Sequence, residues 1–149
     1  MPFTYEYPMP AVTVDAVIFR KTEGSSEVLL IRRLNEPFKG QWAIPGGFIN
    51  IDEELDDAVV RELQEETGIS HHTLKQLFTV GTVGRDPRYR TISVIYFGWF
   101  DETTMRVKAG DDAADAAWFN LKELPSLAFD HRDVLRKVLE ILKKTNHVF

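Results

Sequence analysis

Apolar residues recur along the chain in blocks that predict strands. Residues 12–19 are rich in β-branched and apolar side chains, which is typical of a central strand of a sheet. Residues 27–33 contain a buried-type run of apolar residues and predict a second strand. Residues 73–84 and 90–101 also have strand composition, and the second of these segments is apolar on both faces. A strand of that kind belongs in the interior of a sheet.

Two segments carry the periodicity of amphipathic helices. The first lies within residues 46–69, where a glycine-rich turn leads into about four helical turns that end at Gly68. The second covers residues 132–144, with Asp130 in the position of its N-terminal cap. The apolar stripe of the first helix consists of Leu55, Ala58, Val59 and Leu63.

Three glutamates of the first helix fall on its apolar side. Glu62, Glu65 and Glu66 share the arc of the stripe, so the last turn directs three carboxylates inward. Carboxylates three and four residues apart repel one another, and burial adds to the cost. A divalent cation removes this cost, because hard oxygen ligands suit magnesium or manganese and magnesium bridges to substrate phosphates. On the glutamates alone, an ordinary acidic surface helix is the more common interpretation.

The turn before this helix favours the metal site over an ordinary acidic helix. Pro45 fixes the turn, and Gly46 and Gly47 let the backbone approach a ligand closely. Glu53 follows between these glycines and the glutamate-rich end of the helix. We therefore interpret residues 46–69 as a metal site for a phosphorylated ligand.

These residues resemble the Nudix box position by position. Gly47 is followed after five residues by Glu53, and after seven more residues by the acidic run that begins at Arg61. Residues 38–47 resemble the usual approach to the box. The resemblance implies hydrolysis of a nucleoside diphosphate linked to another moiety. It also implies an α/β fold, the three-layer α/β/α sandwich with a mixed central sheet, formed by one Nudix hydrolase domain over residues 1–149.

The resemblance also implies roles for the residues of the box. A continuous helix would point Glu53 away from Glu62, so we expect Glu53 in the preceding loop, where it braces the loop and the metal site. Arg61 receives an orienting role, although a surface arginine in a helical ion pair fits its spacing equally well. The implied cofactor is Mg2+ or Mn2+. Its implied ligands are Gly47, Glu62, Glu65 and Glu66.

The segment between the two later strands indicates how the substrate is bound. Arg85, Arg88 and Arg90 crowd around Asp86 in the sequence. Guanidinium groups match phosphate and carboxylate oxygens, so these arginines suit a diphosphate or a terminal ribose phosphate, with a solvated hairpin tip as the alternative. This loop and residues 127–131 resemble the ADP-ribose pyrophosphatase branch of the family, which includes the Nudix domains of NAD-related transcriptional regulators.

Each further candidate for substrate binding also has a purely structural interpretation. Arg32 or Arg33, at a strand end, either reaches a phosphate or is an ordinary strand-end charge. Phe38 stacks on a base or packs in the fold, and a lone His131 is more often a structural hydrogen-bonding residue than a catalyst. The substrate-binding residues that we expect are Arg32, Phe38, Gly46, Gly47, Arg85, Arg88, Arg90 and His131.

An acid that precedes Trp118 is the expected general base. In many Nudix enzymes such an acid, in a mobile loop, acts as general base or as an extra metal ligand. Asp112, six residues before Trp118, is the first choice, with Asp111 and Asp115 as rivals. Each of the three acids also fits a turn, a helix cap or a strand edge. The catalytic residues that we expect are Glu53, Glu62, Glu65, Glu66 and Asp112.

Composition limits the class of protein. With 149 residues, 44% of them hydrophobic, the chain suits a single core. The absence of cysteine excludes disulfides and thiolate sites and is consistent with a cytoplasmic protein. No apolar run approaches the length of a membrane span, and residues 1–10 lack the pattern of a signal peptide. A net charge of −5 argues against a nucleic-acid duplex as the main partner.

Three functions stand as hypotheses. The leading one is metal-assisted attack of water on a phosphorus of ADP-ribose, which releases AMP and ribose 5-phosphate. The second is hydrolysis of another nucleotide, such as an oxidised nucleoside triphosphate or a dinucleoside polyphosphate. The third is a non-catalytic module that senses ADP-ribose or another nucleotide, although the box keeps every acid and the sequence ends at Phe149 without an added DNA-binding domain. The oligomeric state stays open, with a homodimer as one option because relatives that act on ADP-ribose are often dimers.

Overall fold

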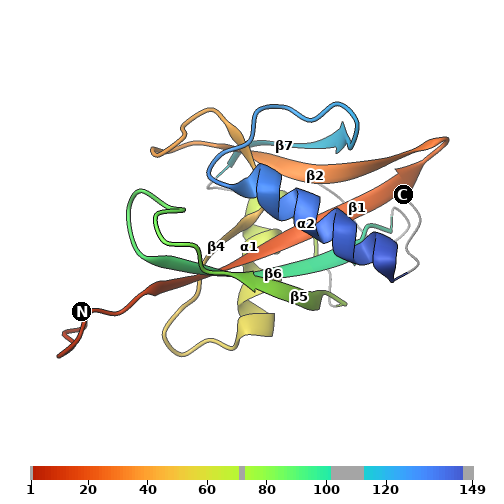
Figure 1. The fold of residues 1–149 in the computed structure, drawn as a ribbon. Coiled ribbons are helices and arrows are strands. Elements are labelled where there is room, and N and C mark those ends of the chain that lie inside the picture. The colour runs from red at the N-terminus through yellow and green to blue at the C-terminus, as the bar shows by residue number, and fades with distance from the viewer. Residues whose placement is uncertain (1, 71–72, 102–112, 146–149) are drawn as a thin grey trace.

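The computed structural model describes residues 2–70, 73–101 and 113–145, which form a sheet with helices on its two sides (Figure 1). The four strands and two helices that the apolar pattern predicts are present, and three further strands at Trp42–Ala43, Gly46–Phe48 and Ala113–Asn120 were not predicted. In chain order the elements are β1 (Ala11–Thr22), β2 (Ser25–Arg33), β3 (Trp42–Ala43), β4 (Gly46–Phe48), α1 (Leu55–Thr67), β5 (Lys75–Val80), β6 (Thr91–Trp99), β7 (Ala113–Asn120) and α2 (His131–Lys144).

Strand β1 is the centre of the sheet. The strands lie in the order β3-β2-β1-β6-β5, while β4 pairs with β1 and β7 pairs with β2. β1 runs parallel to β6 and antiparallel to β2 and β4, so the sheet is mixed. The predictions of a central strand over residues 12–19 and of an interior strand within residues 90–101 are confirmed.

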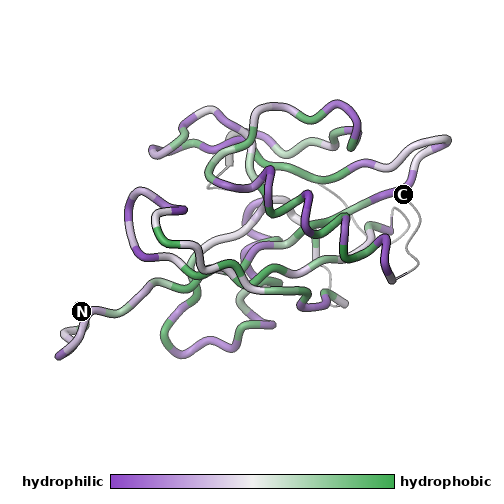
Figure 2. The backbone as a smooth tube through the Cα atoms, viewed as in Figure 1, coloured by the Kyte–Doolittle hydropathy of each residue, from purple (hydrophilic) through white to green (hydrophobic). Residues whose placement is uncertain are grey.

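Alternate residues of β1 face the two helices, because successive side chains of a strand point to opposite faces. Val14, Ala16 and Ile18 pack with the buried residues of α1 in one hydrophobic cluster. Val17 and Phe19 pack with the buried residues of α2 in another. Figure 2 shows hydrophobic colour along the central strands and alternating colour along α2. Each face of the sheet is covered by one helix, which confirms the three-layer α/β/α sandwich.

Strands β1 and β2 pair only next to the hairpin that connects them. Further along, β4 pairs with β1 and β3 pairs with β2. The turn between β3 and β4 is attached to β1, because the Pro45 carbonyl accepts a hydrogen bond from Ala16 N–H at 2.8 Å. A Cβ atom on Gly46 would come within 2.1 Å of Asp15 Oδ1, so the register requires glycine there. The glycine-rich turn is thereby inserted into the sheet.

The end of α1 is set by Gly68, as the sequence predicts. Helix α1 ends at Thr67, and Gly68 follows with φ of 77°, in the left-handed region. Its N–H donates to the Gln64 carbonyl at 2.9 Å and so satisfies one of the last helical carbonyls. The buried Ile69 then anchors the chain directly after the helix.

The start of α2 differs from the prediction in one respect. The helix begins at His131, with Asp130 in the cap position, but the Asp130 side chain makes no capping hydrogen bond. Instead its carboxylate accepts two hydrogen bonds from the Arg85 guanidinium. The predicted position of Asp130 is confirmed, but its predicted capping hydrogen bond is not, because both carboxylate oxygens are engaged by the Arg85 fork. In the described ranges neither helix is long and apolar enough to cross a membrane.

We expect Gly68→Ala to lower the free energy of unfolding by about 1 kcal/mol, because a side chain strains a left-handed residue. Gly68→Asn is the matched control, since asparagine tolerates this conformation, and it should cost clearly less. Urea unfolding of the three proteins measures the difference. Equal losses for alanine and asparagine would contradict the assigned role of the backbone at Gly68.

Candidate active site

A cavity of about 500 Å³ opens where the glycine-rich turn meets the end of α1. This volume falls in the usual range for pockets that hold small ligands. The lining of the cavity is divided by charge between an acidic and a basic part. The acidic part comprises Asp15, Glu62, Glu65 and Glu66. The basic part comprises Arg33, Arg85 and Arg88.

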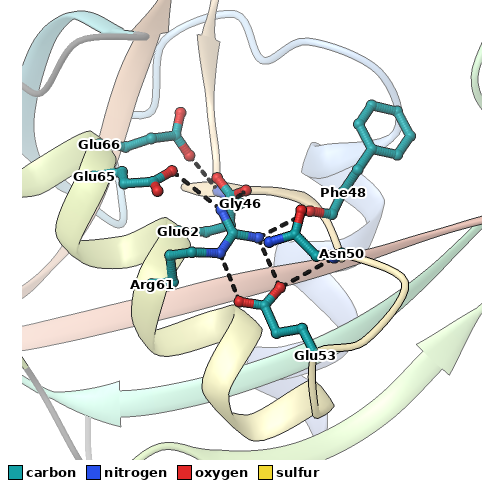
Figure 3. Close-up of polar contacts among 8 residues, drawn as sticks. All are labelled: Gly46, Phe48, Asn50, Glu53, Arg61, Glu62, Glu65 and Glu66. Atoms are coloured by element: carbon teal, nitrogen blue, oxygen red, sulfur yellow. Dashed lines mark hydrogen bonds and ion pairs between the residues drawn. The ribbon is translucent and has the colours of Figure 1, made fainter. Parts of the chain in front are cut away.

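Arg61 lies among the carboxylates of the acidic part. Its Nη1 donates to Glu62 Oε1 at 2.8 Å and to Glu65 Oε2 at 3.2 Å (Figure 3). Its Nε and Nη2 donate to the two carboxylate oxygens of Glu53 at 2.6 and 2.9 Å, and Nη2 also reaches the Phe48 carbonyl at 3.1 Å. The hydrogen bonds to Glu53 raise the pKa of Arg61 above its ordinary value, so the guanidinium keeps its charge. These contacts suit the orienting role expected of Arg61.

Glu53 lies in the loop just before α1, where its distance from Glu62 predicts it. Besides the two bonds from Arg61, Glu53 Oε1 accepts a hydrogen bond from Asn50 N–H at 3.1 Å. The hydrogen bonds from Arg61 are the main reason that the pKa of Glu53 lies below its ordinary value. Glu53 therefore bridges the loop to the helix as an ionised carboxylate.

Both glycines of the turn lie directly against carboxylates. Glu66 is only 6% exposed, and its Oε1 accepts a hydrogen bond from Gly46 N–H at 2.7 Å. A Cβ atom on Gly47 would lie 2.5 Å from the carboxylate carbon of Glu62. The sequence predicts a close approach of this backbone to a ligand, whereas in the structure the backbone approaches the two glutamates themselves. Glu65, with a half-exposed side chain, completes the acidic end of the helix.

The acidic part offers the donor chemistry of a hard divalent cation. Glu62, Glu65 and Glu66 all line the same cavity and present carboxylate oxygens, which suit magnesium or manganese. As they stand, no three acidic or histidine side chains of the described residues are gathered closely enough to hold a metal ion. Arg61 already bonds two of the glutamates, so a cation would compete with its guanidinium for their oxygens.

Asp15 is a buried acid of the cavity that was not predicted as a site residue from the sequence. It lies on β1, is 5% exposed and lines the cavity beside Gly46. Burial raises the pKa of Asp15 to about 7, although the nearby Arg85 charge opposes the rise. One signal could have revealed it, since an aspartate in the middle of an otherwise apolar strand needs a buried polar partner or a function.

The three arginines of the β5–β6 loop do not converge on Asp86. Arg88 pairs with Asp86 at 2.8 Å, but Arg85 pairs with Asp130 at the start of α2 at 2.8 Å. Arg85 and Arg88 line the cavity, whereas Arg90 is exposed and is not among the described residues that line it. The expected cluster of three arginines around Asp86 is therefore not formed, because the Asp130 carboxylate, just before α2, lies within reach of Arg85.

The end of β2 places Arg33 in the cavity and Arg32 outside it. Neighbouring strand residues point to opposite faces, and Arg32 pairs with Asp115 of β7 at 2.5 Å. Asp115, one of the rival acids for the general base, is therefore engaged away from the cavity. Asp112, the first choice, and Asp111 lie outside the described residues.

Phe38 and His131 both serve the fold in this structure. The Phe38 ring packs on the Phe129 ring, with centroids 4.7 Å apart, and Phe38 is not among the described lining residues. His131 is buried, lines the cavity and accepts a hydrogen bond at Nδ1 from Ile44 N–H at 3.0 Å. Burial is the main reason that the pKa of His131 falls to about 4. The neutral imidazole ties α2 to the turn after β3.

Comparison with known proteins relates this geometry to one family. The sequence pattern of the NUDIX domain matches residues 9–140. The ADP-ribose pyrophosphatase of Methanocaldococcus jannaschii is 43% identical over 130 residues, which are 87% of this chain and 73% of that protein. The ADPR responsive transcriptional repressor NtrR of Acinetobacter baylyi is 36% identical over 89% of this chain, which spans only 54% of the repressor.

A solved structure agrees with these sequence relationships. The NUDIX domain of Shewanella oneidensis NrtR, solved in complex with ADP ribose, superposes with a TM-score of 0.83. It is 34% identical in sequence, and the match covers 91% of this chain and 90% of that domain. The expected fold and family resemblance are thus confirmed by independent comparisons.

His131 should stabilise the fold only while its imidazole is neutral. The pKa of about 4 lies below the ordinary value of 6.5, so this stabilisation is complete above pH 6.5 and is lost as the pH falls towards 4. The loss amounts to about 3 kcal/mol at most. His131→Asn keeps an acceptor but cannot titrate, so the difference in unfolding free energy between the two proteins should shrink over this range.

The His131→Asn variant is needed as a reference, because the titration of Asp15 changes the free energy of unfolding in the opposite direction. Its pKa is raised, so the folded state gains stability relative to the unfolded state as the pH falls below about 7. Urea unfolding of both proteins between pH 7 and pH 4 separates the two contributions. A difference that is constant with pH would show that His131 does not titrate on unfolding.

Proposed function

This chain belongs to the Nudix family, and from that premise we propose that it hydrolyses ADP-ribose to AMP and ribose 5-phosphate with Mg2+ or Mn2+ as cofactor. The observation that carries the proposal is the divided cavity, which sets the glutamates of α1 and the arginines of β2 and the β5–β6 loop in one lining. A diphosphate is itself an anion that binds guanidinium groups, and it bridges to carboxylates through a cation. The identity to an ADP-ribose pyrophosphatase supports ADP-ribose as the substrate.

In the proposed reaction, Glu62, Glu65 and Glu66 would hold the cation, with Gly47 as a further ligand. The bound cation would neutralise charge on the diphosphate and lower the pKa of a bound water molecule. Arg61 holds Glu62 and Glu65, and Gly46 N–H fixes one oxygen of Glu66, so each of the three carboxylates has a defined position before the substrate arrives. We assign the general base to Asp112 on the strength of the resemblance.

The arginines and the buried acid complete the proposed site. Arg33 and Arg88 present positive charge to the substrate, while Arg85 is held by Asp130 and gives the basic part a fixed edge. Asp15 of β1 pairs with Gly46, and its side chain lies directly against the backbone of the glycine-rich turn. One water molecule is consumed, and one bond between a phosphorus and the bridging oxygen is broken.

A second candidate function is binding of ADP-ribose without turnover. The likeness to a repressor that responds to ADPR and to a NUDIX domain solved with ADP ribose favours it. We prefer the enzyme because Glu53, Glu62, Glu65 and Glu66 are all present, and a sensing domain does not need the full set of acids. A cytoplasmic location, a homodimeric state and the lack of a nucleic-acid duplex as partner stay predictions.

Incubation of the protein with ADP-ribose and magnesium should release AMP and ribose 5-phosphate in equal amounts. The same panel should contain an oxidised nucleoside triphosphate and a dinucleoside polyphosphate, with products separated by chromatography. Faster turnover of either nucleotide than of ADP-ribose would show that the protein acts on that class of substrate instead. Tight binding of ADP-ribose with no product would instead support the sensing function.

Glu66→Gln should reduce the rate of ADP-ribose hydrolysis by orders of magnitude and leave the fold intact. The glutamine oxygen can still accept the Gly46 hydrogen bond, whereas the charge needed to hold a cation is lost. Glu140→Gln is the matched control, because Glu140 is exposed on α2 and far in sequence from the box. A variant at Glu66 that loses thermal stability while its specific activity stays normal would mean that the acid is structural.

A further inference from the structure

The face of the sheet that α2 covers changes from apolar to polar at the cavity. The buried residues of β1 and β6 that pack against α2 are apolar. Side chains two residues apart in a strand share a face, so the same face continues along both strands into the cavity. There it carries four buried residues that line the cavity and that we call the polar floor, namely Thr13 and Asp15 of β1 and Thr91 and Ser93 of β6. Buried polar groups of this kind need hydrogen-bond partners or a function.

Ser93 is the centre of the hydrogen bonds in the polar floor. Its Oγ accepts a hydrogen bond from Arg85 Nη1 at 2.5 Å and lies 2.5 Å from Thr13 Oγ1 on the neighbouring strand. Burial raises the pKa of Asp15, whereas a hydrogen bond from Ser93 lowers it, so the Ser93 hydroxyl donates to that carboxylate. A serine has one hydroxyl hydrogen. Because Ser93 uses it on Asp15, Thr13 is the donor in its contact with Ser93.

Asp15 is held in place through a chain of contacts that begins just before α2. Asp130 accepts two hydrogen bonds from Arg85, at 2.9 and 2.8 Å, and the Arg85 side chain is only 5% exposed. Arg85 in turn fixes Ser93, which orients the Asp15 carboxylate. On its other side, Asp15 Oδ1 lies against the backbone of Gly46. Ser93 is therefore a positioning residue for a carboxylate that has a defined place in the cavity.

The polar floor uses its three hydroxyl hydrogens within the protein and keeps acceptors for a ligand. Thr13 donates to Ser93, and Ser93 donates to Asp15. Thr91 Oγ1 donates to the Tyr89 carbonyl at 3.2 Å. An ionised carboxylate can accept about four hydrogen bonds, so Asp15 has capacity left. A ligand group that lies on the floor must therefore be a hydrogen-bond donor, whereas a phosphate would be repelled by the charge of Asp15.

We propose that Asp15, positioned by Ser93, binds the neighbouring hydroxyl groups of a ribose that is joined to the diphosphate of the substrate. This sugar subsite rests on the proposed function for the identity of the substrate, and it deepens that function by assigning the sugar. Two adjacent hydroxyl groups can donate to the two oxygens of one carboxylate. Acidic side chains bind ribose hydroxyl groups in dinucleotide-binding proteins of another fold. Asp15 thereby makes the site specific for a sugar that carries both hydroxyl groups.

The amino group of a nucleobase is the other neutral donor that would suit the polar floor. Asp15 lies against the glycine-rich turn, and the Gly46 N–H of this turn donates to Glu66. The polar floor is therefore next to the glutamates that are proposed to hold the cation and the diphosphate. In ADP-ribose each ribose is attached directly to the diphosphate, whereas a ribose separates the base from it. This proximity favours a ribose over a base.

The test compares the affinities of four ligands for the full chain with magnesium at pH 8, above the pKa of about 7 of Asp15. The ligands are ribose 5-phosphate, AMP and the 2-deoxy counterpart of each, and none of them contains a diphosphate bond. Calorimetry should show that the wild-type protein binds a ribose ligand about tenfold or more tightly than its deoxy counterpart. This preference identifies the terminal ribose if it appears for ribose 5-phosphate, and the adenosine ribose if it appears for AMP.

Three variants connect the preference to the polar floor. Asp15→Asn should abolish it, because an amide that donates replaces one acceptor oxygen, while the affinities of the deoxy ligands change little. Asp133→Asn is the matched control, since it removes the same charge from a side chain of α2 that is 75% exposed, and it should keep the preference. Ser93→Ala should reduce the preference although the carboxylate is still present, as expected when a positioning residue is lost.

The other outcomes decide against the sugar subsite or against the substrate. A wild-type protein with no preference in either pair, or an Asp15→Asn protein that keeps the preference, overturns the subsite. Equal weakening of AMP and its deoxy counterpart, with ribose 5-phosphate unchanged, assigns Asp15 to the base. If the preference depends on Asp15 but ADP-ribose is not hydrolysed, the subsite stands and the proposed substrate fails. Should Asp15→Asn not fold, Ser93→Ala replaces it, and a wild-type preference in that variant overturns the proposal.

Discussion

The site depends on one arginine that bonds three carboxylates. Arg61 bonds Glu53, Glu62 and Glu65 at once and also reaches the backbone of β4, so it ties the loop, the helix and the turn together. Without that positive charge the glutamates at the end of α1 would repel one another. The guanidinium therefore lets the acidic cluster exist in the protein before any cation is bound, and it keeps the carboxylate oxygens facing the cavity.

The second constraint is the insertion of the glycine-rich turn into the central sheet. β1 and β2 separate beyond their hairpin, and the space between them is filled by β3 and β4. This brings Gly46 against Asp15 at a distance that no side chain would permit, and it places the Gly46 N–H within hydrogen-bond distance of Glu66. The same insertion buries Asp15 beside the charged lining, so the architecture of the sheet and the electrostatics of the site have one cause.

Local features of the sequence were sufficient to predict much of this. The helix stop at Gly68, the central strand and the acidic end of α1 follow from periodicity and from residue types a few positions apart. Partners far apart in the sequence were not predictable in the same way. The pairing of Arg85 with Asp130 joins residues 45 positions apart, and the choice of Arg33 over Arg32 depends on which face of β2 meets the cavity.

The distribution of charge around the cavity connects the fold to its chemistry. Carboxylates and guanidinium groups normally neutralise one another in pairs, yet here Arg33 lies half-buried beside another arginine, and Asp15 is buried near further acids. Groups of like charge are kept close by the backbone attachments of β3, β4 and the start of α2. Such an arrangement is costly in the protein alone. A ligand that brings anionic oxygens to the arginines and a cation to the glutamates would offset this cost, as the metal-bound diphosphate of the proposed substrate would.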